Sequence, residues 1–261
     1  MSFKYFSKLP RLKLLLLANL KVDADELMEL RHPSLTQLMM AGSVIEDGKM
    51  DFLEGLPNLE WLGLDAGASL FSDNSLKHVE TLAKLSHLSL KHTQFTDDGL
   101  DHLFGLRNLS ELQIVESRIS DDGLAKIIKN WPELRVLSLD YSAITDVGLV
   151  QLPELKQLRV FAGQGCEGIG APSFSAIARV SSLEHLVLFR TSLTDDDVQK
   201  LSALKSLNHL NIANTKVTDG CVDSLLKFPS LKLLDIQGTA ITAEGVARLR
   251  AGLQNCDVRI Q

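Results

Sequence analysis

Cysteine is scarce in this chain of 261 residues. Its three cysteines, Cys166, Cys221 and Cys256, are an odd number, lie far apart and form no CxxC pair. They indicate neither a disulfide framework nor a zinc site. We therefore expect no structural metal and predict a reducing, cytoplasmic location.

Basic charge and long apolar runs are also missing. The 27 lysines and arginines stand against 33 acidic residues, a net charge of −6, so the basic face of a nucleic-acid binder is not expected. No apolar run reaches the roughly 18 residues that a membrane helix needs. The leucine-rich stretch at 14–20 follows several basic residues, like the core of a signal peptide, but no convincing cleavage site comes after it. Neither a membrane span nor a signal peptide is predicted.

Common catalytic signatures are absent as well. None of GxSxG, HExxH or GxxxxGK occurs in the sequence, nor any set of cysteines and histidines at metal-ligand spacing. An enzyme would need a nucleophile with its base, a metal cluster or a phosphate loop. We therefore expect a chain without catalytic activity and without a cofactor.

The sequence has instead one six-residue phrase, beginning with leucine, that recurs in register. The phrases start at Leu12, Leu35, Leu59, Leu85, Leu109, Leu134, Leu158, Leu183, Leu207 and Leu231. Their spacing of 23 to 26 residues is typical of a solenoid. The sequence therefore predicts a single domain over 1–261, with about ten repeats at 12–255 between an N-terminal cap at 1–11 and a capping strand at 256–261.

Each repeat is expected to hold one strand and one helix. In the phrase at 109–114 apolar and polar residues alternate, which predicts a short strand with one buried face. The segment at 119–124, ISDDGL, then places a serine at a helix N-cap and carboxylates in the first turn. A helix of about ten residues should follow, as where Leu100, Leu103 and Leu106 form an inward stripe. These aspartates are interpreted as structural.

The pattern LxxLxLxxTxITDxGLxxLxxL resembles the leucine-rich repeat superfamily, in particular its bacterial ITDxGL type. It is also similar to ribonuclease-inhibitor-like and F-box-associated arrays, although no F-box precedes Leu12. The resemblance implies an α/β fold: a right-handed solenoid, or horseshoe, with parallel strands on the concave face and short helices on the convex face. It further implies a scaffold that binds proteins through the concave face.

The repeat register predicts which side chains a partner would meet. Counted from the first leucine of each phrase, the residues at positions three, five, seven and eight should point from the strands onto the concave surface. Bulky aromatic and charged residues gather there in repeats three to eight, the types enriched at binding hot spots. The candidate partner-binding residues are Trp61, Asp65, His87, Lys91, His92, Glu111, Glu116, Asp140, Tyr141, His185, Phe189 and Arg190. The alternative interpretation is an ordinary solvated face.

Two features suggest other functions. His185 and His209 fall on adjacent strands, but a metal site usually needs three or four converging ligands, so solvated histidines are the preferred interpretation. The segment Gly163–Gly170 contains GxGxxG between a strand and a helix. Because it keeps the repeat spacing and lacks a following acidic residue at the next strand end, we interpret it as a loop with Pro172 at the helix start. An enzyme or nucleotide binder is the alternative, and so is a recognition loop paired with the insertion at 65–74.

The N-terminal edge is the last open question. Leucines at 14–17 face both sides of the first expected strand. Residues 1–10 are expected to fold over this edge as a cap, which predicts a monomer. The alternative is that the edge pairs with a second copy, as an open strand edge can, giving a homodimer or a self-assembling structural protein.

Overall fold

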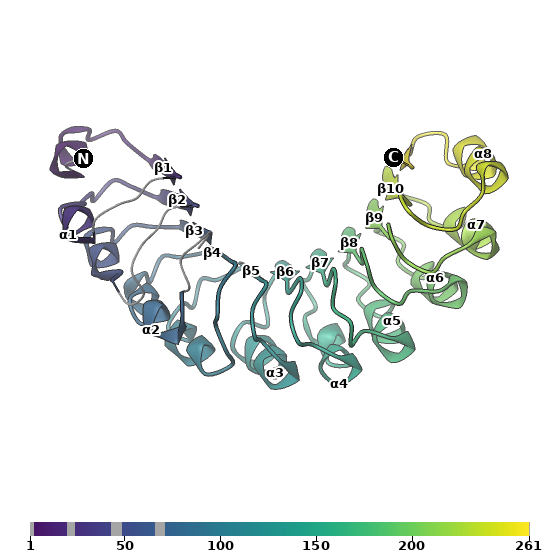
Figure 1. Cartoon of the computed structure of the whole chain (residues 1–261), viewed down its shortest axis with the longest axis horizontal. Helices are drawn as coiled ribbons and strands as arrows, with labels where there is room; N and C mark the ends of the chain where they lie inside the picture. Colours follow the sequence, from purple (N-terminus) through teal and green to yellow (C-terminus); the bar gives the residue numbers. More distant parts are fainter. Residues whose placement is uncertain (1–2, 20–23, 43–48, 66–70, 261) are drawn as a thin grey trace. The chain divides into compact units, whose positions relative to one another are not determined.

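The computed structural model describes residues 3–19, 24–42, 49–65 and 71–260. Parallel strands alternate with short helices along the chain, so the fold is the expected leucine-rich repeat solenoid. The chain divides into two compact units, Met1–Ile119 and Ser120–Gln261, called here the first and second unit. In each unit the strands form one layer and the helices another (Figure 1).

The first unit contains five strands of five residues each, and consecutive strands pair in parallel. The strands are β1 (Leu14–Ala18), β2 (Gln37–Ala41), β3 (Trp61–Asp65), β4 (His87–Lys91) and β5 (Glu111–Val115). The described helices of this unit are short, with three to six residues each, and several are 3₁₀: η1 (Phe3–Lys8), α1 (Ala24–Leu27), η2 (Asp51–Gly55), α2 (Asp73–Leu76), η3 (Val79–Thr81) and η4 (Gly99–Leu103). Long strands and short helices characterise this unit.

The second unit has the opposite proportions, with strands of three residues and helices of up to ten. Its strands are β6 (Val136–Ser138), β7 (Val160–Ala162), β8 (His185–Val187), β9 (His209–Asn211), β10 (Leu233–Asp235) and β11 (Asp257–Arg259). Its helices are α3 (Asp121–Asn130), α4 (Asp146–Leu149), η5 (Leu152–Glu154), α5 (Ala171–Ile177), α6 (Asp195–Leu201), η6 (Asp219–Cys221), α7 (Val222–Leu225) and α8 (Ala243–Gly252). Strand β11 pairs with β10 inside the segment predicted to be a final strand.

The core is built from the first, fourth and sixth residues of each phrase. In the repeat that contains β4, Leu85, Leu88 and Leu90 are each at most 1% exposed. The strand alternation turns these leucines toward the helices, and burying each one contributes roughly 1.5 to 3 kcal/mol. No single repeat can bury this surface alone, so the repeats depend on their neighbours.

A carboxylate joins several of the helix starts to the next repeat. Asp121 accepts hydrogen bonds from the backbone N–H of Thr145 (2.7 Å) and from its hydroxyl (2.6 Å). A Cβ on Gly148 would lie 2.5 Å from the same carboxylate, so glycine is needed there. The same arrangement joins Asp73 to Thr96, Asp195 to Thr218, and Asp219 to Thr242. The recurring ITDxGL phrase is therefore a link between repeats, and its aspartates are structural.

The expected helix length is correct in some repeats and wrong in others. Helices α3 and α8 have ten residues, as predicted. The helix expected around Leu100 is only the five-residue 3₁₀ helix η4. That repeat is one residue shorter than the repeat that carries α3, yet its leucine stripe is still buried. Among the described residues, no helix combines the length and apolar character that a bilayer crossing requires.

The described part of the N-terminal segment is folded against the chain. Phe3 in η1 is 1% exposed, and its ring stacks on Phe6 with centroids 5.7 Å apart. The His32 ring nitrogen Nε2 bonds to the Leu9 carbonyl at 3.1 Å. A cap over 1–11 remains a prediction, and residues 66–70 of the predicted insertion lie outside the described residues.

Candidate functional site

Each unit presents one sheet face that its helices do not cover, called here the strand face. In β4, Leu88 and Leu90 are buried, while His87, Ser89 and Lys91 point away from the core. The strand face therefore carries the third, fifth and seventh residues of each phrase, as the alternation predicted. The sheet dictates the position of these side chains but not their chemistry.

Histidine–carboxylate pairs occupy one part of the strand face in the first unit. His87 Nε2 lies 3.0 Å from a Glu111 oxygen, and His92 Nδ1 lies 2.7 Å from a Glu116 oxygen. His92 Nε2 is also 3.9 Å from an Asp65 oxygen. Contacts of this kind between exposed side chains contribute only about 0 to 1 kcal/mol to stability.

Two further predicted residues of the first unit stand beside these pairs. The indole of Trp61 lies flat along its own strand, because a Cβ on Gly63 would be 2.5 Å from the ring. Lys91 follows on β4 and is exposed. Within the part of the chain that the structure describes, Lys91 makes no ion pair.

Sequence reasoning missed an apolar patch on the strand face of β1 to β3. Leu14, Leu16 and Met39 are 55%, 54% and 41% exposed, and together with Trp61 they form the patch. With Gln37 they line a hollow of about 220 Å³. The leucines at 14–17 face both sides of β1 and indicate such a patch. From the sequence alone they were instead used to predict a strand edge that is capped or paired. Exposed apolar clusters on a soluble chain mark contact surfaces.

In the second unit, Asp140 has a structural role. Its carboxylate accepts hydrogen bonds from the Ser138 hydroxyl (3.0 Å) and from the backbone N–H of Gln164 (2.9 Å). Tyr141 follows, 36% exposed, and its ring fills the space where a side chain on Gly165 would stand. Asp140 and Tyr141 therefore stabilise the junction between adjacent repeats, whatever else they contact.

Phe189 and Arg190 form a second feature of this unit. The Arg190 guanidinium carbon lies 5.6 Å from the Phe189 ring centroid, within cation–π range. Phe189 is half-buried and Arg190 exposed. This pair is the strongest candidate anchor that the strand face of the second unit presents.

The two predicted histidines of the second unit meet as a pair. The rings of His185 and His209 lie with centroids 4.1 Å apart. Desolvation, then the charges of His185, Lys232 and Arg259, lower the pKa of His209. These surroundings therefore favour the neutral form of His209 over the charged one.

The eighth residue of each described phrase has a left-handed backbone. Some repeats use residues that accept this conformation readily, namely Asn19, Gly42, Gly165, Asn214 and Gly238. Four repeats place other side chains there: His92, Glu116, Tyr141 and Arg190, with φ between 54° and 57°. The left-handed conformation is unfavourable for most L-residues, at a cost of about 1 to 2 kcal/mol. Such strain often accompanies function, and all four belong to the predicted partner-binding set.

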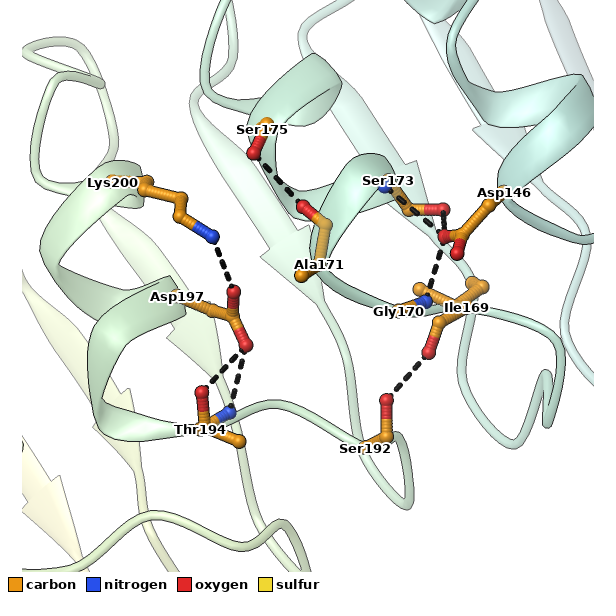
Figure 2. Close-up of polar contacts among 10 residues, drawn as sticks. All are labelled: Asp146, Ile169, Gly170, Ala171, Ser173, Ser175, Ser192, Thr194, Asp197 and Lys200. Atoms are coloured by element: carbon orange, nitrogen blue, oxygen red, sulfur yellow. Dashed lines mark hydrogen bonds and ion pairs between the residues drawn. The ribbon is translucent and has the colours of Figure 1, made fainter.

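The C-terminal end of the glycine-rich loop at 163–172 is held by hydrogen bonds within the chain. Asp146 accepts hydrogen bonds from the backbone N–H groups of Gly170 (2.8 Å) and Ser173 (3.1 Å), and from the Ser173 hydroxyl (Figure 2). Burial acts to raise the pKa of Asp146, but these hydrogen bonds outweigh it and lower the pKa overall. The donors that a phosphate would need at the start of α5 are therefore engaged by a carboxylate of the chain itself.

The same loop explains a change in the next repeat. Ala171 stands where other repeats carry the linking aspartate, so Thr194 lacks that partner. Asp197, within the same helix start, accepts from the Thr194 hydroxyl at 2.7 Å and lies 2.9 Å from the Lys200 amine (Figure 2). The loop departs from the repeat pattern, and α6 compensates with a local cap.

One described group of side chains could converge on a metal ion. Ligand atoms of Asp51, Glu54 and His78, on the helix side of the first unit, all lie within 4.8 Å of one another. Sequence reasoning did not bring these three residues together, because their spacing follows no ligand motif. Exposed acidic groups such as these are common without a metal, and the group supports no functional assignment.

Comparisons with known proteins agree with the fold. The family model described as "Leucine Rich repeat" matches residues 81–104, which include β4 and η4. A comparison with curated proteins gave no match.

Solved structures share the architecture over nearly the whole chain. An internalin (inlF) of Listeria monocytogenes is 21% identical, with a TM-score of 0.66, over 97% of this chain and 82% of its own. A leucine-rich repeat protein of Leptospira interrogans is 17% identical, with a TM-score of 0.55, over 100% and 77%. A plant peptide hormone receptor, RGFR1 in complex with RGF2, is 13% identical, with a TM-score of 0.51, over 96% and 47%. At these identities the likeness establishes the fold alone.

Proposed function

We propose that this chain is a non-enzymatic scaffold that binds a protein or peptide through its strand faces. The observation that carries the proposal is the apolar patch in the first unit. Its large apolar side chains are exposed to water, although the fold does not require apolar residues at these positions. The strained residues His92, Glu116, Tyr141 and Arg190 support it, since folding would favour asparagine or glycine at their positions. One of the similar solved structures is described as a plant peptide hormone receptor in complex with RGF2, which supports a peptide as one class of partner.

The chemistry of the thiols favours a chain without catalytic activity. Burial is the largest cause that raises the pKa of Cys221, to about 12, and burial also raises the pKa values of Cys166 and Cys256. A nucleophilic cysteine needs the opposite shift. Three free thiols also suit a reducing compartment, and we propose a cytoplasmic location on that ground.

Affinity capture from a lysate of the source organism tests the proposal. The parent chain is compared with Trp61→Ala in the first unit and with a Phe189→Ala/Arg190→Ala double variant in the second, after all three are shown to melt alike. Val147→Ser, an exposed change on the helix side, is the matched control. A protein retained by the parent and the control but lost from either strand-face variant supports the proposal. Equal retention by all four chains contradicts it.

Self-assembly through β1 is the second candidate function. Among the described strands, β1 pairs only with β2, and Leu14 and Leu16 lie exposed on it. An open edge beside apolar side chains can recruit another copy. This alternative predicts a mass that rises with protein concentration in light scattering and that is unaffected by the Phe189→Ala/Arg190→Ala variant.

A further inference from the structure

The strand face of the first unit changes character from β1 to β5. Across β1 to β3 it is apolar, since Leu14, Leu16 and Met39 are each more than two-fifths exposed. Across β4 and β5 it carries the histidine–carboxylate pairs and Lys91. A partner seated across these strands would therefore meet apolar groups first and charged groups afterwards.

Two separate hollows lie next to each other on this face. The first, about 220 Å³, is lined by the apolar patch and Gln37. The second, about 140 Å³, shares Met39 and Trp61 with it and extends to Ser89, Lys91 and Gln113. Each is smaller than the roughly 300 to 1,000 Å³ of a typical small-molecule site. They suit individual side chains of a macromolecular partner better than a whole metabolite.

The charges determine which group should follow the apolar ones. Glu111 lies against His87, and Glu116 and Asp65 lie against His92. Lys91 has no ion pair with any described residue, although its amine borders the second hollow. The polar wall beside it is already fixed, because the Ser89 hydroxyl donates to Gln113 Oε1 at 3.3 Å. Asp65, opposite Lys91 on β3, also lines the second hollow. A carboxylate that approaches the Lys91 end of the hollow would find an amine without an ion pair among the described residues.

The geometry points to one class of partner for this face: a segment of another protein that carries large apolar side chains followed by a carboxylate. The apolar side chains occupy the hollow between β1 and β3, and the carboxylate meets Lys91. This inference rests on the proposed function and assigns the partner's chemistry to one of its two strand faces.

Selection from a phage-displayed library of random peptides on the full chain tests the inference. The expected enriched peptides combine leucine, methionine or phenylalanine with a later aspartate or glutamate. Met39→Asp and Lys91→Glu should each weaken their binding about tenfold or more, and both sites are exposed, so the fold is retained. Exchange of the peptide's acid for lysine should restore binding to Lys91→Glu and weaken binding to the parent, an exchange that a merely unfolded variant could not give.

The other outcomes separate this inference from the proposed function. If enriched peptides bind but lose affinity only with Phe189→Ala/Arg190→Ala, the scaffold function stands and the partner assigned here is wrong. If Met39→Asp abolishes a dimer of the chain and no peptide is enriched, a second copy covers the patch and the inference is overturned. If the library yields no peptide whose binding depends on either strand face, the inference fails. The proposed function is then left with a folded protein, and not a peptide, as the partner.

Discussion

The two units differ in the lengths of their helices and of their strands. In the first unit the strands have five residues and the described helices three to six, whereas in the second the strands have three and α3 and α8 reach ten. The first unit exposes an apolar patch on its strand face, while on the strand face of the second Val160, Val187 and Phe189 are half-buried. One repeat plan therefore yields a unit with a broad contact face and a unit dominated by capped helices.

The linking carboxylates occur in both units. In the second unit Asp121, Asp146, Asp195 and Asp219 each bond to the following repeat. In the first unit Asp73 bonds to Thr96 in the same way. The repeat register alone therefore does not determine which side chains a repeat exposes on its surface.

The largest effect is expected from a charge in either core. Leu112→Asp in β5 and Leu210→Asp in β9 bury an unpaired carboxylate at residues that are at most 1% exposed. Each should cost about 3 to 5 kcal/mol of unfolding free energy. Because solenoid repeats depend on their neighbours, amide hydrogen exchange should accelerate mainly in the unit that carries the change.

Gln113→Asp, one residue along β5 and facing solvent, is the control for the first substitution. It should leave the melting temperature nearly unchanged. Uniform loss of protection across both units after Leu112→Asp would contradict the division into two units.

The next largest effect concerns the links of the second unit. Asp121→Ala removes the acceptor of two hydrogen bonds from Thr145. Hydrogen bonds to a charged group contribute about 1.5 to 3 kcal/mol, so urea unfolding should reveal a loss of that order. Asp122→Ala, exposed in the same helical turn, should change stability by less than about 0.5 kcal/mol. Equal losses from the two variants would show that the link has no special role.

Relief of left-handed backbone should raise stability slightly in both units. Glu116→Asn and Arg190→Asn install the residue found at the matching positions Asn19 and Asn214. We expect a gain of about 0.5 to 1 kcal/mol, reduced by the lost contact with His92 or Phe189. If the same variants also lose the captured partner, strain and recognition occupy the same residues. A drop in stability with unchanged binding would assign these side chains to folding.

The smallest effect is a pH dependence confined to the second unit. The pKa of His209 is lowered on folding, so the unfolded chain binds the proton more readily. Its contribution is complete above the ordinary histidine value of 6.5 and is lost as the pH falls toward the folded pKa. The melting temperatures of His209→Asn and the parent should therefore differ by a constant amount above pH 7, and below pH 6.5 that of the parent should fall relative to that of the variant. Identical profiles throughout would show that the ring pair does not influence folding.

Much of the fold could be predicted, because the leucine register determines strand positions and the alternation determines which side chains face solvent. Helix lengths could not, since η4 and α3 follow nearly the same motif in repeats that differ by one residue. The left-handed eighth position had a visible signal in Gly42, Gly165 and Gly238, but the other side chains at that position obscured it.

The candidate site was predictable only in part. The positions of its residues follow from the repeat register. The hollow beside Trp61 and the unpaired amine of Lys91, however, depend on how side chains lie across several strands. The glycines of the loop at 163–172 resembled a nucleotide motif because the sequence cannot show that Asp146, more than twenty residues away, bonds to that loop.

Methyl NMR of the chain labelled at leucine, methionine and valine tests the central claim most directly, with a captured partner or a selected peptide as titrant. The account predicts that the methyl signals of Leu14, Leu16 and Met39 shift first, on the strand face of the first unit. Shifts confined to Val147 and Val150, exposed on the helix side of the second unit, would place the contact surface elsewhere and contradict it.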